Sequence, residues 1–205
     1  MSKKMHIDVV TTYFYPVTAG IETNILETYA VLAQLGWSIT IHTTASTLDE
    51  KNILPSQEVI RGMQVIRYRE HLFGFSPILD YTTTGMICLH NFNIFPHLTI
   101  LVIAFCHRLI KSRHYGIFLT PHGGFTPEWP LFPWLTRSIK RLYHQTVGRL
   151  LIGSVVDGIR AISKWENQEL IKFGLRPSKI ILIENGLDPV AKLNHSKLAS
   201  SKIKG

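Results

Sequence analysis

Short apolar runs of strand character alternate with longer amphipathic segments along the whole chain, and this alternation limits the folds available to it. The runs with strand character are 6–12, 38–43, 59–68, 86–90, 116–120, 155–162 and 180–183. The segments with helical periodicity are 22–35, 96–111, 134–152 and 164–173. This order predicts βαβ units, and therefore an α/β protein with a doubly wound, mostly parallel sheet and helices on both faces. The run 180–183 is expected to be a strand buried on both sides.

Composition excludes several classes of protein. The chain has 205 residues, of which 45% are hydrophobic, too many for a disordered protein. Its only cysteines, Cys88 and Cys106, provide neither a disulfide framework nor a zinc site. The N-terminus has no signal-peptide pattern, and the longest apolar run, 98–106, is too short to span a bilayer. We therefore expect a cytoplasmic protein with one domain over 1–188 and a linker or tail over 189–205.

The chain is basic, with 22 Lys and Arg against 14 Asp and Glu and a net charge of +8. Such a charge suits nucleic acid, anionic lipid or phosphorylated ligands equally well. Several of the lysines lie near the two ends, where a solubilising role accounts for them. No recognition motif supports nucleic-acid binding, so we do not expect a nucleic-acid partner.

The loop 15–22 follows the first predicted strand and contains Gly20 and Glu22. Ligands of such sheets bind at the carboxyl ends of the strands. A glycine here lets the backbone approach a ligand, and the N–H groups of the following helix can bind a phosphate. Glu22 has a structural alternative, because acidic side chains favour the positive end of a helix dipole.

Two histidines follow buried strands at the same predicted edge. His90 and Asn91 follow the run 86–89, while His122 and Gly123 follow the run 116–119. A histidine at this edge can exchange a proton near pH 7 or orient a sugar hydroxyl. The alternative for each is a structural hydrogen bond to a nearby carbonyl oxygen.

Ser163 precedes the predicted helix 164–173, with Glu166 three residues further on. A capping box explains this pair, and no nucleophile elbow surrounds the serine. The sequence contains no H-E-x-x-H motif, no cysteine pair and no phosphate-binding loop of the G-x-x-x-x-G-K-[ST] type. We therefore expect no metal.

Five segments, taken in order, resemble one family. They are 15–22 (YPVTAGIE), 90–92 (HNF), 120–123 (TPHG), Ser163 with Glu166, and 185–188 (NGLD). Together they are similar to the amino-terminal half of retaining glycosyltransferases of the GT-B fold, in glycosyltransferase family four. The resemblance implies two Rossmann-like domains facing each other across a cleft. The first domain mainly binds the acceptor and the second binds the nucleotide-sugar donor.

The resemblance also assigns roles to residues. It places Gly20 against the donor diphosphate and makes His122 the catalytic residue that contacts the transferred sugar. The remaining positions that it implies in substrate binding are Glu22, His90, Asn91, Gly123, Ser163 and Asn185. It implies no metal and no cofactor, since the nucleotide-sugar is a co-substrate and its leaving diphosphate can take the acceptor proton.

The chain departs from the family pattern at Ala19, which replaces the first glycine of a pair, and at Glu184, which replaces a proline. It also ends at Gly205, before the donor-binding domain would begin. We therefore expect an acceptor-binding domain that is inactive without a donor-binding C-terminal domain or separate subunit. Its other expected partners are a nucleotide-sugar and a glycan or lipid-linked acceptor. The alternative is a non-catalytic scaffold of the same fold that recruits a partner at a membrane surface.

The segment 134–152 carries an apolar stripe beside many basic residues. One interpretation is a surface helix that packs its stripe on the sheet. The other is that its basic face, with Arg137, Lys140 and Arg141, contacts anionic lipid headgroups at the cytoplasmic face of a membrane.

Overall fold

The computed structural model describes residues 5–47, 54–71, 74–92, 94–123 and 133–185. An eight-stranded sheet organises them, in the order β3-β4-β2-β1-β5-β6-β7-β8. All neighbouring strands run parallel except the hairpin pair β3 and β4. The strands are β1 His6–Val10, β2 Ser38–Thr44, β3 Gln57–Ile60, β4 Met63–Tyr68, β5 Met86–His90, β6 Gly116–Thr120, β7 Gly158–Ala161 and β8 Ile180–Leu182. The predicted doubly wound α/β fold is confirmed.

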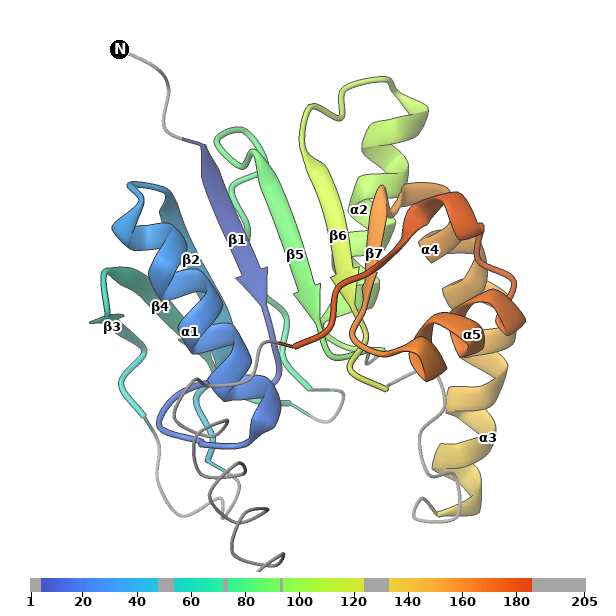
Figure 1. Cartoon of the computed structure of the whole chain (residues 1–205), viewed down its shortest axis with the longest axis horizontal. Coiled ribbons are helices and arrows are strands. Elements are labelled where there is room, and N and C mark those ends of the chain that lie inside the picture. The colour runs from blue at the N-terminus through green and yellow to red at the C-terminus, as the bar shows by residue number, and fades with distance from the viewer. Residues whose placement is uncertain (1–4, 48–53, 72–73, 93, 124–132, 186–205) are drawn as a thin grey trace, which may run out of the picture.

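Helices cover both faces of this sheet (Figure 1). They are α1 Gly20–Gln34, α2 His97–Leu109, α3 Trp134–Tyr143, α4 Arg149–Val155 and α5 Lys164–Lys172. The chain moves outward from β1 in one direction and from β5 in the other. Because parallel crossovers are right-handed, α1 covers one face while α2 and α4 cover the opposite face. Each side has its own core, with Ile25 of α1 in one and Ile100 of α2 in the other.

The segment predicted as a long helix over 134–152 departs from the expectation. It contains α3, a π-helical turn His144–Gly148 and α4. The α4 end, with Ile152 and Val155, lies in the core, and Tyr143 at the last position of α3 packs against it. None of the residues of α3 is buried, and its apolar side chains Leu135, Ile139 and Leu142 are 54%, 55% and 65% exposed. Packing of this stripe on the sheet is therefore wrong for α3, which extends beyond the sheet (Figure 1).

The expectation that 180–183 is buried on both faces is also wrong. β8 is the edge strand of the sheet and pairs only with β7 among the described strands. Ile180 packs against the core, whereas Ile181 and Ile183 are about half exposed. An apolar run predicts a strand here correctly, but it does not reveal whether the strand is central or at the edge.

Candidate functional site at the carboxyl edge of the sheet

The strand order reverses between β1 and β5, and the candidate site lies at the carboxyl ends of the strands around this point. In doubly wound sheets such a reversal opens a crevice in which ligands bind. His90 is the last residue of β5, and His122 follows β6 by two residues. Arg160 lies in β7, and α1, which follows β1 in the chain, begins at Gly20. The topology thus brings residues distant in sequence to one edge.

A chain of hydrogen bonds joins a tyrosine and two histidines at this edge. The hydroxyl of Tyr29 in α1 lies 2.8 Å from Nε2 of His90. Nδ1 of His90 lies 3.1 Å from Nε2 of His122, and the two rings stack with 5.4 Å between their centroids. The partners of His90 are therefore Tyr29 and His122, and the structural alternative of a carbonyl partner is wrong for it.

The remaining ring nitrogen, Nδ1 of His122, makes no hydrogen bond to a described residue. If the Tyr29 hydroxyl donates to His90, His90 donates to His122, and Nδ1 of His122 carries the outward proton. The reverse order makes that atom an acceptor. In either case, the hydrogen bonds hold Nδ1 of His122 in a fixed orientation, in which it can donate to or accept from a ligand.

Both histidines are neutral at pH 7. Burial lowers the pKa of His90 well below its ordinary value, and His122 and Arg160 lower it further. Burial also lowers the pKa of His122 to about 4, with a further contribution from Arg160. The pair therefore binds as neutral hydrogen-bonding groups and does not supply a positive charge.

The loop after β6 has a backbone that few side chains favour. His122 has a φ of +52° and Gly123 a φ of +80°. The carboxylate of Glu166 accepts the N–H of Gly123 at 2.6 Å and the N–H of Ile162 at 2.8 Å. Glu166 therefore connects α5 to the loop that carries His122.

The start of α5 confirms that Ser163 caps this helix, but Glu166 has other partners than the predicted capping box gives it. Ser163 is the N-cap of α5, and its hydroxyl accepts the N–H of Glu166 at 3.1 Å. Glu166 does not bond back to Ser163, as a full capping box requires, but to the two backbone groups named above. Its bond to Gly123 was not predictable, because the two residues are 43 positions apart.

Arg160 is a candidate site residue that the sequence motifs do not reveal. Its guanidinium donates to Oδ1 of Asn185 at 2.9 Å, to Oδ1 of Asn24 at 3.4 Å and to the carbonyl of Ile183 at 3.1 Å. It thereby links β7, α1 and the segment after β8, and it places a cation at this edge. The only signal in the sequence is a basic residue within the apolar run 155–162.

The loop before α1 provides open space. A Cβ built on Gly20 would meet nothing within 4 Å. Ala19 is the N-cap of α1 with a φ of −125°, a conformation open to alanine, so the departure from a glycine pair costs nothing in backbone strain. Glu22 lies in the first turn and is buried, and its Oε2, which has almost no accessible surface, has no hydrogen-bond partner among the described residues.

Of the other predicted site residues, two lie at the carboxyl edge and three lie on α3. Asn91 follows His90 with a φ of +65°, and its N–H donates to the carbonyl of Thr120. Asn185, the last described residue, is held by Arg160. Arg137, Lys140 and Arg141 lie on α3, which extends beyond the sheet. The predicted segment 186–188 and the predicted tail lie outside the described residues.

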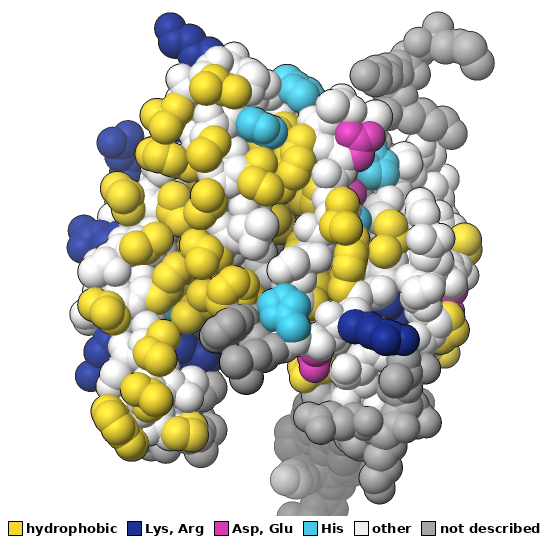
Figure 2. Space-filling view, turned by 180° about the vertical axis from the view of Figure 1, so that it is seen from behind, with side chains coloured by type: hydrophobic (Ala, Val, Ile, Leu, Met, Phe, Trp, Pro, Cys, Tyr) yellow, Lys and Arg dark blue, Asp and Glu magenta, His cyan; other side chains and the backbone are white. Residues whose placement is uncertain are grey.

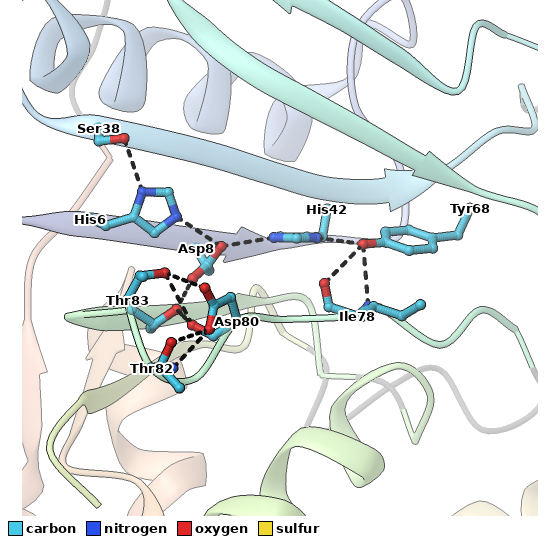
Figure 3. Close-up of polar contacts among 10 residues, drawn as sticks. His6, Asp8, Ser38, His42, Tyr68, Ile78, Asp80, Thr82 and Thr83 are labelled. Carbon is cyan, nitrogen blue, oxygen red and sulfur yellow. Dashed lines mark hydrogen bonds and ion pairs between the residues drawn. The ribbon is translucent and has the colours of Figure 1, made fainter.

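A second polar network lies within the sheet (Figure 3). Asp8 of β1 accepts from Nε2 of His42 at 2.8 Å and from Nε2 of His6 at 3.2 Å. Its other oxygen accepts the hydroxyl of Thr84. Nδ1 of His42 lies 2.8 Å from the hydroxyl of Tyr68, which accepts the N–H of Ile78. These bonds fasten the segment before β5 to the sheet face opposite α1.

Comparison with known proteins identifies the family. Residues 18–190 match Glycosyltransferase Family 4. The chain belongs to this family. Its fold is similar to that of the Anabaena protein Alr3699/HepE, solved with UDP and glucose, at a TM-score of 0.53 and 15% identity over 90% of this chain and 45% of that one. It is also similar to sucrose-phosphate synthase from Thermosynechococcus elongatus, at a TM-score of 0.51 and 14% identity over 97% of this chain and 99% of that one.

These findings make the chain a family-4 glycosyltransferase sequence with the Rossmann-like architecture of a GT-B half. It spans less than half the length of the Anabaena protein. None of the curated protein sequences matches it. Family membership does not favour the alternative of a non-catalytic scaffold.

The described residues contain no group of three or more His, Cys, Asp or Glu that could hold a metal ion, and no helix among them is long and apolar enough to cross a membrane.

Proposed function

We propose that this chain is the acceptor-binding half of a retaining glycosyltransferase that transfers a sugar from a nucleotide-sugar to a glycan or lipid-linked acceptor. The observation that carries the proposal is the Tyr29–His90–His122 chain, which ends at the carboxyl edge on Nδ1 of His122, an atom with no hydrogen bond to a described residue. The Anabaena protein of similar fold was solved with UDP-glucose, which supports a nucleotide-sugar as the donor.

In the transfer, the bond between the anomeric carbon and the donor diphosphate breaks, and the acceptor oxygen bonds to that carbon. The acceptor proton goes to the leaving diphosphate. His122 is neutral at pH 7, because its pKa is lowered to about 4 by burial and by Arg160. Its role is therefore to hold a sugar hydroxyl by a hydrogen bond that strengthens in the transition state.

The diphosphate and the acceptor would use opposite sides of the loop 15–22. Gly20 leaves open space at the start of α1, where helix N–H groups and the Arg160 cation suit a diphosphate. Oε2 of Glu22 has no partner among the described residues, and an acceptor hydroxyl that reached it would satisfy this buried oxygen. Asn91, Gly123, Ser163 and Asn185 would complete the binding surface.

Amide chemical-shift mapping tests this proposal on the 205-residue protein. UDP-glucose and octyl glucoside serve as probes of the donor and acceptor classes. We expect shifts at the amides of Gly20, Asn91 and Gly123, and none at Gly62 in the β3–β4 turn. Absence of shifts at the first three for both probes would overturn the proposal.

The isolated chain should also transfer no sugar, because the residues that bind the donor nucleotide in this family lie in the other domain. Turnover by the purified 205-residue protein at an ordinary enzymatic rate, about 1 s⁻¹ or faster, would refute this part of the proposal.

We also propose that α3 contacts an anionic membrane surface. Its apolar side chains face solvent, and Arg137, Lys140 and Arg141 lie on the same helix. Figure 2 shows hydrophobic side chains over the side of the molecule that holds α3 and α4, with Lys and Arg along its edge. Each basic residue near an anionic surface contributes about 1 kcal/mol, so three can hold the protein there reversibly.

Co-sedimentation with vesicles tests the membrane contact. Binding should increase with the fraction of phosphatidylglycerol, decrease with salt, and disappear in the triple variant Arg137→Glu, Lys140→Glu, Arg141→Glu. Equal sedimentation of the parent and this variant would contradict the proposal, provided that circular dichroism shows both folded.

A further inference from the structure

A groove away from the carboxyl edge gathers basic side chains from three segments. Its volume is about 580 Å³, and its walls include Arg108 of α2, Arg149 of α4, and Arg176 and Lys179 from the turn between α5 and β8. Helix α2 precedes β6, α4 precedes β7, and this turn precedes β8. The groove therefore lies toward the amino ends of the strands, opposite to His90 and His122.

No carboxylate is among the residues that line the groove. Asp157 is the nearby acid, and it already pairs with Arg113 at 2.5 Å and accepts the N–H of Ile117 at 2.8 Å. In the described part of the chain, none of the four lining basic residues forms an ion pair. The groove therefore carries positive charge that the described residues do not neutralise.

Two of the four basic residues also have structural uses. Nζ of Lys179 donates to the carbonyls of Gly153 at 3.1 Å and Val156 at 2.6 Å, at the end of α4. Arg108 lies in the last turn of α2, where a cation is favourable. No such use accounts for Arg149 and Arg176.

The position of Arg149 is fixed by a glycine. Gly174 has a φ of +92°, and a Cβ built on it would lie 2.2 Å from Nη2 of Arg149. The guanidinium of Arg149 therefore lies against the backbone of Gly174, beside the groove. The absence of a side chain at Gly174 makes this arrangement possible.

The positive charges in the groove repel one another. Burial lowers the pKa of Lys179, Asp157 acts in the other direction, and Arg108 and Arg176 lower it further. A bound anion would remove this repulsion. Guanidinium groups are suited to phosphate, because their planar donors can bind two oxygens at once.

We propose that this groove is a second binding site, for a phosphate-bearing anion, separate from the sugar-transfer site. Two sources can present this chemistry: a soluble oligophosphate, or a lipid headgroup with a terminal phosphate. The site uses none of the residues at the carboxyl edge, so it stands independently of the proposed glycosyltransferase role.

Calorimetric titration with tripolyphosphate at low salt tests the soluble source. The parent chain should bind saturably, and Arg149→Gln with Arg176→Gln should weaken binding by about tenfold or more, because two charge-assisted contacts are lost. The control, Arg137→Gln with Arg141→Gln on α3, changes the net charge equally and should leave binding nearly unchanged. Arg176→Gln alone, at an exposed position, should give a partial loss and guards against misfolding of the double variant.

Vesicles test the lipid source. Phosphatidic acid has a terminal phosphate, whereas phosphatidylglycerol does not, and the two are compared at equal surface charge. If the ligand is a headgroup, the parent should bind phosphatidic acid vesicles more tightly than phosphatidylglycerol vesicles, and the groove variant should bind both equally. The proposal is overturned if the parent neither binds tripolyphosphate nor prefers phosphatidic acid, or if the groove and control variants weaken tripolyphosphate binding equally.

Discussion

The carboxylate of Glu166 accepts the backbone N–H of Gly123 at a distance of 2.6 Å. This bond fixes the loop that follows β6, and with it the position of His122. Glu166→Gln replaces one acceptor oxygen with an NH₂ group that cannot accept, so a partly buried N–H of Gly123 or Ile162 loses its partner. We expect a loss of about 1–3 kcal/mol in the free energy of unfolding, measured by urea titration.

Glu169→Gln is the matched control for that prediction. Glu169 lies on the same helix and pairs with the exposed Lys172 at the surface. Surface pairs contribute little, so this variant should change stability by no more than about 0.5 kcal/mol. Equal effects of the two variants would show that the bond to Gly123 is not important for the fold.

His122→Ala should lower turnover without unfolding the protein. In an enzyme that combines this chain with its donor-binding half, we expect kcat to decrease by tenfold or more, which corresponds to about 1.4 kcal/mol of transition-state stabilisation. His122→Gly should behave alike and also relieve the positive φ of +52° at this position. The exposed His114 provides a control, and an unchanged rate in both His122 variants would contradict the role.

The sequence predicted the elements of this site better than their connections. Ser163 was recognised as a cap because capping depends on residues three positions apart. The contacts of Glu166 with Gly123 and of Arg160 with Asn24 join residues 43 and 136 positions apart. Such contacts follow from the packing of strands at one edge, which local periodicity does not specify.

The same limit explains the two corrections to the fold. The apolar positions of α3 and β8 were recognised correctly as helix and strand stripes. Burial, however, depends on which element lies opposite, and α3 extends past the sheet while β8 is at its edge. Periodicity predicts which residues share a face, but it does not predict what covers that face.

Stability should depend on pH between 6.5 and 4 through His122. Its folded pKa is about 4, below the ordinary value of 6.5, because of burial and the Arg160 charge. The contribution of neutral His122 to stability is complete above pH 6.5 and is lost as the pH falls to about 4. The reason is that His122 takes up a proton at a higher pH in the unfolded chain than in the folded one. The difference of 2.5 pKa units corresponds to about 3 kcal/mol at most. Urea titrations at pH 7 and 4.5 should show a smaller decrease for His122→Gly than for the parent.

Asp8 should produce a second loss of stability at lower pH. Burial raises the pKa of Asp8, but the hydrogen bonds from His42 and Thr84 and the charges of His42 and His6 outweigh it, so the net pKa is below the ordinary 3.8. A carboxylate with a lowered pKa stabilises the fold above 3.8, and this contribution disappears as the pH falls further. Asp8→Asn should be less stable than the parent at pH 7, and the difference should shrink below pH 3.8. A difference that is constant with pH would contradict the ionised state of Asp8.

The two components of membrane contact on α3 can be separated. Ile139→Ser with Leu142→Ser removes exposed apolar area but no charge, and because both side chains are more than half exposed, folding should be little affected. Charge provides the long-range attraction and apolar burial the insertion. This variant should therefore still bind phosphatidylglycerol vesicles at low salt but detach at about 0.15 M salt, where the charges are screened beyond about 8 Å. The charge variant Lys140→Glu with Arg141→Glu should fail to bind at either salt concentration. If the Ser variant binds as well as the parent at both concentrations, the exposed stripe of α3 has no part in the membrane contact.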